Sequence, residues 1–127
     1  MTPPPPLDWE DIPGGPAAGT VLARLDEIPP DGAHCLSFEE GSLRFEGFIQ
    51  RRDELVVAYE NSCPHARLPL DWTPGRFLDV AKRHIRCANH GARFRIIDGY
   101  CVSGPCKGRY LRALPIRVVD NDIIAGI

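Results

Sequence analysis

Two short cysteine–histidine pairs constrain this chain more than any other feature of its sequence. The first is Cys63-Pro64-His65, the second is Cys87-Ala88-Asn89-His90, and 21 residues separate them. Each pair follows a run of residues typical of a β-strand. We therefore expect each on a loop at a strand end, where the backbone can direct two side chains at one point. The fold must then bring two such loops together around a shared centre.

The four side chains of these pairs suit two kinds of metal centre. Two thiolates and two neutral imidazoles satisfy one tetrahedral metal ion, or the two irons of a [2Fe–2S] cluster with two ligands each. Structural zinc ligands are usually spaced C-x2-4-C and H-x3-5-H, and a C-x-H pair is a tight bite for one ion. The spacing favours the cluster and leaves zinc as the alternative.

The remainder of the chain predicts an antiparallel all-β domain. Short runs of β-branched and aromatic residues alternate with Gly, Pro, Asp and Asn, and no long helical period competes with them. Hairpin signals stand at Glu40-Gly41, Asp98-Gly99 and Asn121-Asp122. The predicted strands are 21–25, 35–38, 43–50, 55–60, 83–86, 92–97, 111–119 and 123–125.

Length and local composition predict one domain with a tail. The chain has 127 residues, which allow one modest core and leave no space for a second catalytic domain. Residues 1–17 are rich in Pro and Gly, so we expect an extended, mobile tail from which Trp9 could dock back onto the body. The β domain is expected over residues 18–127.

The sequence also bears on location. It shows no secretory signal, and no stretch approaches the roughly 18 apolar residues of a membrane span. Five cysteines are an odd number, and without an export signal they favour metal ligation or free thiols over a disulfide framework. We expect a soluble cytoplasmic protein with no membrane partner.

Charge is divided unevenly along the chain. Residues 1–62 contain 12 acidic and 4 basic residues, whereas residues 63–127 contain 5 acidic and 11 basic ones. The bases are spread among apparent strands and turns instead of clustering with aromatic residues on one element, which argues against a nucleic-acid partner. They are either an ordinary solvated face or a cationic rim that steers acidic electron-transfer partners.

The two pairs resemble the signature of the Rieske iron–sulfur family, C-x-H followed by C-x-x-H, and the similarity extends from about Val21 to the C-terminus. The resemblance implies a Rieske-type antiparallel β-sandwich or barrel with two cluster-binding loops and one [2Fe–2S] cluster per chain. It implies that Cys63 and Cys87 hold an inner iron, and that His65 and His90 hold an outer iron near the surface. Gly104-Pro105 looks like the family's proline loop, which covers the cluster.

Within the family, high-potential members carry a loop disulfide and two hydroxyl donors near the cluster. At the corresponding positions this chain has Leu68, Asn89, Ala92 and Phe94. Such hydroxyl bonds stabilise the reduced cluster, so their absence predicts a potential near the low end of the Rieske window of roughly −150 to +300 mV. The chain is similar to the Rieske ferredoxins that serve oxygenases. The segment between the two pairs, which includes Trp72 and Phe77, is longer than usual.

Other chemically active residues receive plainer interpretations. We expect Cys101 and Cys106 to be free thiols, with a redox-active disulfide or a second metal site as alternatives. Cys35 lies in an apolar run and is expected to be a small buried residue.

Two histidines and two aromatic residues are assigned structural roles. The isolated histidines, His34 and His84, have no evident partner and are not expected to bind metal. Trp72 and Phe77 are assigned to the core by default, the alternative being that they shield the cluster.

The function implied is that of a one-electron carrier between a reductase and an oxygenase or other redox acceptor, without a small-molecule substrate. The chain is not expected to be an enzyme. A non-haem iron oxygenase site needs two further histidines and a carboxylate. Only His34 and His84 remain, and a catalytic domain cannot fit in what is left of the 127 residues. Two alternatives stay open: a noncatalytic Rieske subunit of a larger reductase or oxygenase complex, and a zinc-stabilised interaction module.

Overall fold

The computed structural model describes residues 3–89 and 91–126. Within them, nine strands form three antiparallel sheets of three strands each. In spatial order the first sheet is β1 (Val21–Arg24), β9 (Asp122–Ala125) and β8 (Ile116–Val119). The second is β2 (Ala33–Glu40), β3 (Leu43–Arg52) and β4 (Leu55–Glu60), and the third is β5 (His84–Arg86), β6 (Arg93–Arg95) and β7 (Cys101–Ser103). Two 3-10 turns, η1 (Trp9–Asp11) and η2 (Leu25–Glu27), complete the regular structure.

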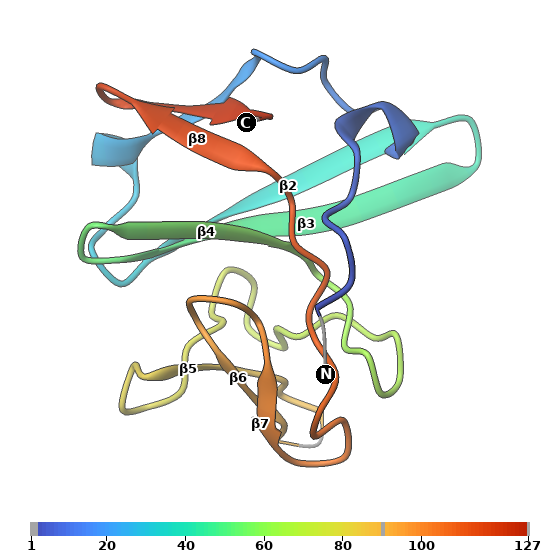
Figure 1. The fold of residues 1–127 in the computed structure, drawn as a ribbon, viewed down its shortest axis with the longest axis vertical. Helices are drawn as coiled ribbons and strands as arrows, with labels where there is room; N and C mark the ends of the chain where they lie inside the picture. The colour runs from blue at the N-terminus through green and yellow to red at the C-terminus, as the bar shows by residue number, and fades with distance from the viewer. Residues whose placement is uncertain (1–2, 90, 127) are drawn as a thin grey trace.

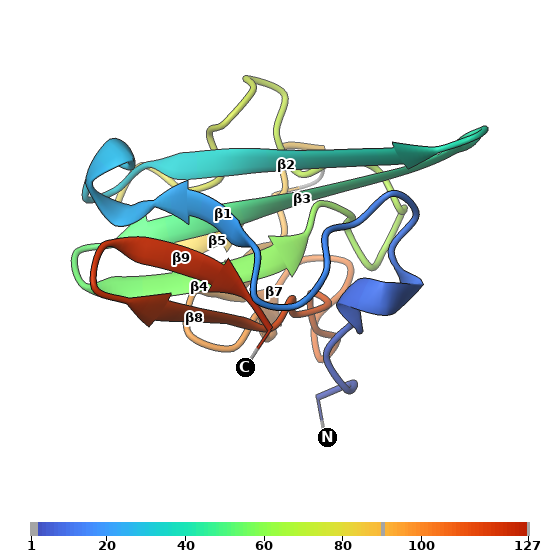
Figure 2. The same ribbon diagram turned by 90° about the horizontal axis from the view of Figure 1, so that it is seen from above.

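The second sheet lies between the other two and separates two cores (Figures 1 and 2). Because side chains alternate along a strand, Phe45 and Ile49 of β3 point to the first sheet while Phe48 points to the third. In β4, Ala58 and Tyr59 divide in the same way. The second sheet is thus the platform on which both outer layers rest.

The lobe that contains the third sheet is made mostly of loops. Its strands are three residues long. The segment 61–83 joins them to β4 of the second sheet, and the segment 104–115 joins them to β8 of the first sheet (Figure 1). Tyr59 ties the lobe to the second sheet, since its hydroxyl donates to the Ile96 carbonyl over 2.6 Å. The Phe48 and Phe77 rings stack at a centroid separation of 3.8 Å. Cys63 and Cys87, the two cysteines of the pairs found in the sequence, belong to the core of this lobe.

The predicted antiparallel all-β class is confirmed, and most predicted strands are found with shifted ends. Two differences are larger. Only Ile116–Val119 of the predicted strand 111–119 is a strand, and β7 was not predicted because its three residues run directly into Gly104-Pro105. The last hairpin turns one residue earlier than predicted, at Asp120-Asn121, where Asp120 has a φ of +54°.

The segment at the beginning of the chain contacts the body at several points. Trp9 is buried and its indole N–H donates to the Pro115 carbonyl at 2.6 Å. The Leu7 N–H donates to the Ala113 carbonyl at 2.9 Å. The boundary between a tail at 1–17 and a domain at 18–127 stays a prediction. Among the described residues, no helix is long and apolar enough to cross a membrane.

Candidate metal centre

The first pair lies on a tight loop directly after β4. The Cys63 N–H donates to the Leu68 carbonyl at 2.9 Å, and the Arg67 N–H donates back to the Cys63 carbonyl at 2.7 Å. Asn61 closes the loop from outside, because its side-chain oxygen accepts the Leu70 N–H at 2.7 Å. The turn buries the Cys63 side chain and leaves His65 exposed.

The second pair lies on the loop between β5 and β6. The Cys87 N–H donates to the Ala92 carbonyl at 2.9 Å, and the Gly91 N–H donates to the Cys87 carbonyl at 2.9 Å. This loop is tied to the first one, because the Ala88 N–H donates to the Leu70 carbonyl at 2.9 Å. Cys87 is fully buried. His90, the fourth predicted ligand, lies outside the described residues.

The fold buries the two cysteine thiols in one core cluster of the lobe, close enough for each to act on the other. Burial raises the pKa of the Cys63 thiol, and the neighbouring Cys87 raises it further. The backbone N–H groups of His65 and Ala66 act in the opposite direction because they donate toward the Cys63 sulfur. Two buried thiols therefore share a pocket in which the surrounding backbone supplies donors for sulfur.

A side chain supplies one more donor. The Asn89 amide nitrogen lies 3.6 Å from the Cys87 sulfur and 2.9 Å from the Pro69 carbonyl oxygen, and it donates to both. The Asn89 amide oxygen accepts the Trp72 indole N–H at 2.9 Å. This bond fixes which end of the amide faces the sulfur. Sequence reasoning identified Asn89 only as a replacement for a disulfide cysteine and did not anticipate this contact.

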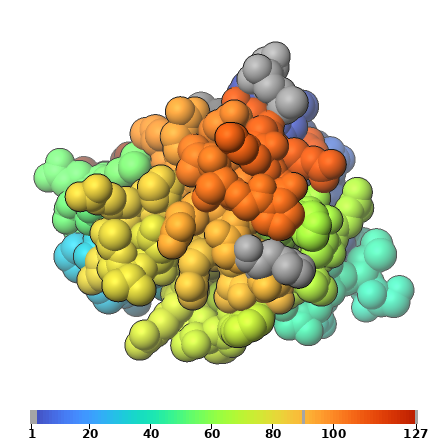
Figure 3. All heavy atoms as spheres, turned by 90° about the horizontal axis from the view of Figure 1, so that it is seen from below, coloured from blue at the N-terminus to red at the C-terminus, as the bar shows by residue number. Residues whose placement is uncertain are grey.

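A third segment, 101–109, covers the loops that carry Cys63 and Cys87, which we call the two ligand loops. Gly104 has a φ of +98°, and a Cβ atom there would stand 2.7 Å from the Ala92 Cα, so only glycine permits the close packing against the second loop. Arg109 reaches the first loop, donating from Nη1 to the Pro64 carbonyl at 3.2 Å. Seen from below, the yellow-green, yellow and orange segments that hold these loops share one face (Figure 3).

The residues described here suit iron–sulfur ligation. Thiolate ligands of a buried cluster need hydrogen-bond donors, since their charge is otherwise poorly compensated away from water. Backbone N–H groups serve Cys63 and the Asn89 amide serves Cys87. Among the described residues, no group of three or more His, Cys, Asp or Glu side chains is arranged to hold a metal ion. The full set of Cys63, His65, Cys87 and His90 therefore stays a prediction.

Four predictions about single residues can be compared with the structure. Cys35 is exposed, so the prediction of a buried residue is wrong: it pairs with Phe48 of β3 on the face of β2 that does not carry Leu36, and the segment around Gly75 covers it only in part. Trp72 is 72% exposed, which contradicts the default core assignment, whereas Phe77 is in the core. His84, predicted to have no partner, lies with Nδ1 3.5 Å from a carboxylate oxygen of Asp79.

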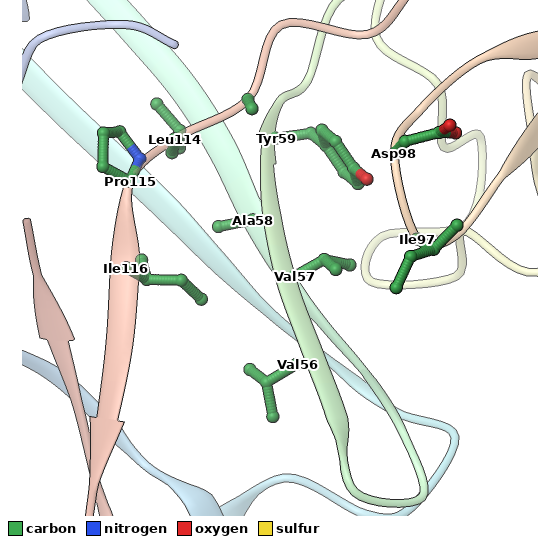
Figure 4. Close-up of a pocket in the computed structure, with 10 residues that line it drawn as sticks. Val56, Val57, Ala58, Tyr59, Ile97, Asp98, Leu114, Pro115 and Ile116 are labelled. Atoms are coloured by element: carbon green, nitrogen blue, oxygen red, sulfur yellow. The ribbon is translucent and has the colours of Figure 1, made fainter. Parts of the chain in front are cut away.

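Two hollows of the described surface have neither thiol in their walls. One of about 240 Å³ lies between β4 and β8, and Val56, Ile97 and Ile116 line its apolar walls (Figure 4). Another, of about 920 Å³, runs between the segment 72–82 and the start of β2 and includes Trp72 in its wall. Neither is lined by Cys63 or Cys87, although Arg86 and Ala88, on either side of Cys87, line the second.

Comparison with known proteins agrees with this arrangement. The family model described as Rieske [2Fe-2S] domain matches residues 21–119. Curated proteins give no match.

Solved structures show the same fold at low sequence identity. The ferredoxin of carbazole 1,9a-dioxygenase from Nocardioides aromaticivorans IC177 superposes with a TM-score of 0.68 and 24% identity, covering 87% of this chain and 98% of that one. The Sphingomonas yanoikuyae B1 ferredoxin gives a TM-score of 0.60 and 19% identity, with coverage of 86% and 98%. A chain from the complex of reduced oxygenase and oxidised ferredoxin in carbazole 1,9a-dioxygenase gives 0.65 and 18%, with coverage of 84% and 100%.

Proposed function

Because the chain belongs to the Rieske [2Fe–2S] domain family, we propose that it is a small one-electron carrier with one cluster. The proposed ligands are Cys63, His65, Cys87 and His90. In this assignment the two buried cysteines hold the inner iron and the two histidines hold the outer iron. When bound, the cluster takes up and releases one electron, and mixed thiolate and imidazole ligation raises its potential relative to an all-cysteine cluster.

The observation that carries the proposal is the pair of neighbouring buried thiols, each served by a hydrogen-bond donor, on two loops joined by a backbone hydrogen bond. The cysteine sulfurs sit inside the lobe while His65 is at the surface. An electron that leaves by the histidine edge has the shortest path to a partner. The chain's own residues therefore hold, insulate and orient the centre.

The proposed partners are a reductase that donates the electron and an oxygenase or another redox protein that accepts it. Two of the similar structures are of ferredoxins of carbazole 1,9a-dioxygenase, and one of these was solved in complex with the oxygenase. These likenesses support the proposal through the shared fold. We further propose a cytoplasmic protein with no catalytic site of its own, since a reducing compartment suits five cysteines outside any disulfide framework.

The test is the metal content and spectrum of protein purified under anaerobic conditions. We expect two irons and two acid-labile sulfides per chain, a visible absorption that bleaches on reduction, and the electron paramagnetic resonance signal of a reduced mixed-ligand cluster. Colourless protein with one zinc ion and no labile sulfide would refute the cluster and favour the zinc-stabilised module.

Variants of single cysteines separate ligation from a general effect of losing a thiol. Cys63→Ser and Cys87→Ser should each abolish cluster binding and lower the melting temperature, because metal-site binding energy is also folding energy. Cys35→Ser is the matched control: it removes an exposed thiol of β2 outside the centre and should leave iron content unchanged. A chain that purifies only as part of a larger complex would favour the noncatalytic subunit.

A further inference from the structure

Two other cysteines of the lobe have no part in the proposed ligation, yet their sulfurs nearly touch. Cys101 is the first residue of β7, and Cys106 lies in the turn after the Gly104-Pro105 step. Both side chains are buried, and their Sγ atoms are 3.1 Å apart. That separation is about 1 Å longer than the S–S bond of a disulfide.

The backbone already holds these two residues opposite each other. The Cys101 N–H donates to the Arg109 carbonyl at 2.8 Å, and the Gly108 N–H donates to the Cys101 carbonyl at 3.0 Å. The Arg109 N–H closes the turn by donating to the Cys106 carbonyl at 2.9 Å. A disulfide between two cysteines whose backbones are held side by side needs little backbone movement, which is the main structural requirement for forming one.

The pair lies next to the proposed centre. The Cys106 side chain neighbours Cys63 as well as Cys101, and these three thiols belong to one core cluster with Cys87. The segment that the pair would close, 101–106, includes Gly104, which packs on Ala92 of the second ligand loop. A covalent link at its base would hold the cover of both ligand loops in place.

We propose that Cys101 and Cys106 form a second redox site, a dithiol that a small peroxide oxidises reversibly to a disulfide. One thiolate attacks hydrogen peroxide, the O–O bond breaks, hydroxide leaves and a sulfenic acid forms. The second thiol then attacks the sulfenyl sulfur, the S–S bond forms, the S–O bond breaks and water leaves. In total the two thiols lose two electrons and two protons, and the peroxide becomes two molecules of water.

The chemistry differs from that of the proposed carrier, because a disulfide takes two electrons whereas the cluster takes one. Burial of both sulfurs keeps large disulfide oxidants away and admits a small peroxide only when the turn opens, so the reaction is slow. In a reducing compartment the pair rests as thiols and closes under oxidative conditions. The oxidised form then carries a cross-linked cover over the two ligand loops.

Peptide mapping tests the proposal directly, because trypsin leaves Cys101 and Cys106 in one peptide and places each of the other three cysteines in a peptide of its own. Cys101 and Cys106 share the peptide 96–107, while Cys35, Cys63 and Cys87 fall in 25–44, 53–67 and 87–93. The protein as purified is reduced, treated with hydrogen peroxide, alkylated in denaturant, digested and weighed. We expect the peptide 96–107 to change from two alkyl groups to none, with the loss of two hydrogen atoms, and to regain both alkyl groups after dithiothreitol.

Cys35 sets the oxidant dose within the same sample, since it is an exposed cysteine whose peptide reports oxidation without a neighbouring thiol. If the peptide 96–107 still carries two alkyl groups, or carries only sulfinic and sulfonic acids, at a dose that oxidises Cys35, the proposal is wrong. A Cys106→Ser variant should leave Cys101 alkylated at the dose that bridges the wild type.

This test is independent of the proposed function. If the protein is colourless as purified and still forms the bridge, the cluster is refuted and the dithiol site is supported. If the protein is fully coloured as purified and never forms the bridge, the cluster is supported and the dithiol site is refuted.

Discussion

At the scale of single residues, the environment of the Cys87 sulfur depends on a chain of two side chains. Trp72 holds the Asn89 amide oxygen, and the Asn89 amide nitrogen faces the sulfur. The positions where high-potential relatives carry hydroxyl donors are Ala92 and Phe94, which have none. Asn89 thus supplies a side-chain donor to the sulfur of Cys87, a proposed ligand.

Removing this donor should lower the midpoint potential. An added electron makes the cluster more negative, so a hydrogen bond to ligand sulfur stabilises the reduced state more than the oxidised state. For Asn89→Leu we expect a fall on the order of 50 mV, close to the roughly 59 mV of a tenfold change in a one-electron equilibrium. Protein-film voltammetry measures it. An unchanged potential would show that the contact does not tune the centre.

Trp72→Phe tests the support of that amide. It keeps an aromatic ring at an exposed site and removes the indole N–H that fixes the Asn89 orientation. We expect a smaller fall in potential than for Asn89→Leu, and no further fall when the two changes are combined. An additive effect in the double variant would mean that Trp72 acts by another route.

The ligand pairs could be predicted at this scale, and the second sphere could not. Cys63 and His65 are neighbours in sequence, so their spacing alone indicates a shared role. Asn89 and Trp72 are 17 positions apart and meet only because the long segment between the pairs folds back. Cys35 was mistaken for a core residue because an apolar run does not state which of its alternate side chains faces inward.

At the scale of elements, the segment 61–83 connects the ligand loops to the platform sheet by one aromatic contact. Phe77 is 1% exposed and its ring stacks on Phe48 of β3 at an angle of 7°. Phe77→Ala should lower the free energy of unfolding by about 3–5 kcal/mol, the usual cost of a buried phenylalanine. Trp72→Ala, a larger deletion at an exposed site of the same segment, should cost under about 1 kcal/mol. Urea unfolding compares them, and equal losses would contradict the assignment.

Asp79 organises the turn that leads into β5. Its carboxylate accepts the Arg83 N–H at 3.0 Å and lies 3.4 Å from the Arg93 guanidinium. Burial alone raises the pKa of Asp79, but the backbone N–H groups of Arg83 and His84, together with the charges of His84 and Arg93, hold the pKa below its ordinary value.

The sign of the resulting pH dependence follows from that direction. A carboxyl whose pKa is lower in the folded than in the unfolded state stabilises the fold above the unfolded value of 3.8, and this stability is lost as the pH falls through the lower folded value. Asp79→Asn should therefore cost about 1–3 kcal/mol at neutral pH and show a shallower loss of stability on acidification. Thermal melts of both proteins from neutral pH to about pH 3 measure this. Parallel curves would contradict it.

Strand identity followed from local pattern wherever a strand was long. β2, β3 and β4 each have six residues or more, with runs of apolar and aromatic residues, and each was predicted near its observed position. β7 has three residues, too few for a period of two to be recognised, and its pairing with β6 is decided by the turn at Asp98-Gly99. The short strands exist because the loops around them are packed, which no local pattern reports.

At the scale of the whole molecule, the uneven charge of the sequence becomes a difference between its two ends. The basic second half supplies the ligand loops and their cover, and on these Arg67, Lys107 and Arg109 are exposed. Most acidic residues belong to the first half, which builds the platform sheet and one strand of the first sheet. A charge pattern of this kind orients an approaching partner before contact.

If the basic residues guide an acidic partner, its electron-transfer rate should fall as salt is added. The screening length shortens from about 30 Å at 0.01 M salt to about 8 Å at 0.15 M, so attraction between the proteins then acts over a smaller distance. We expect the second-order rate of reduction of a cognate acceptor, followed by stopped flow, to fall by about tenfold or more over that range. Arg67→Glu with Lys107→Glu should slow the reaction at low salt and flatten its salt dependence.

The control for this pair carries the same change in net charge on the opposite sheet. Arg24→Glu with Arg117→Glu alters exposed residues of β1 and β8, which lie on the far side of the platform from the ligand loops. A local docking face requires that the control slow transfer much less than Arg67→Glu with Lys107→Glu, because field strength falls with distance from each charge. Equal slowing by both pairs would assign the effect to net charge, and a rate that rises with salt would exclude an acidic partner.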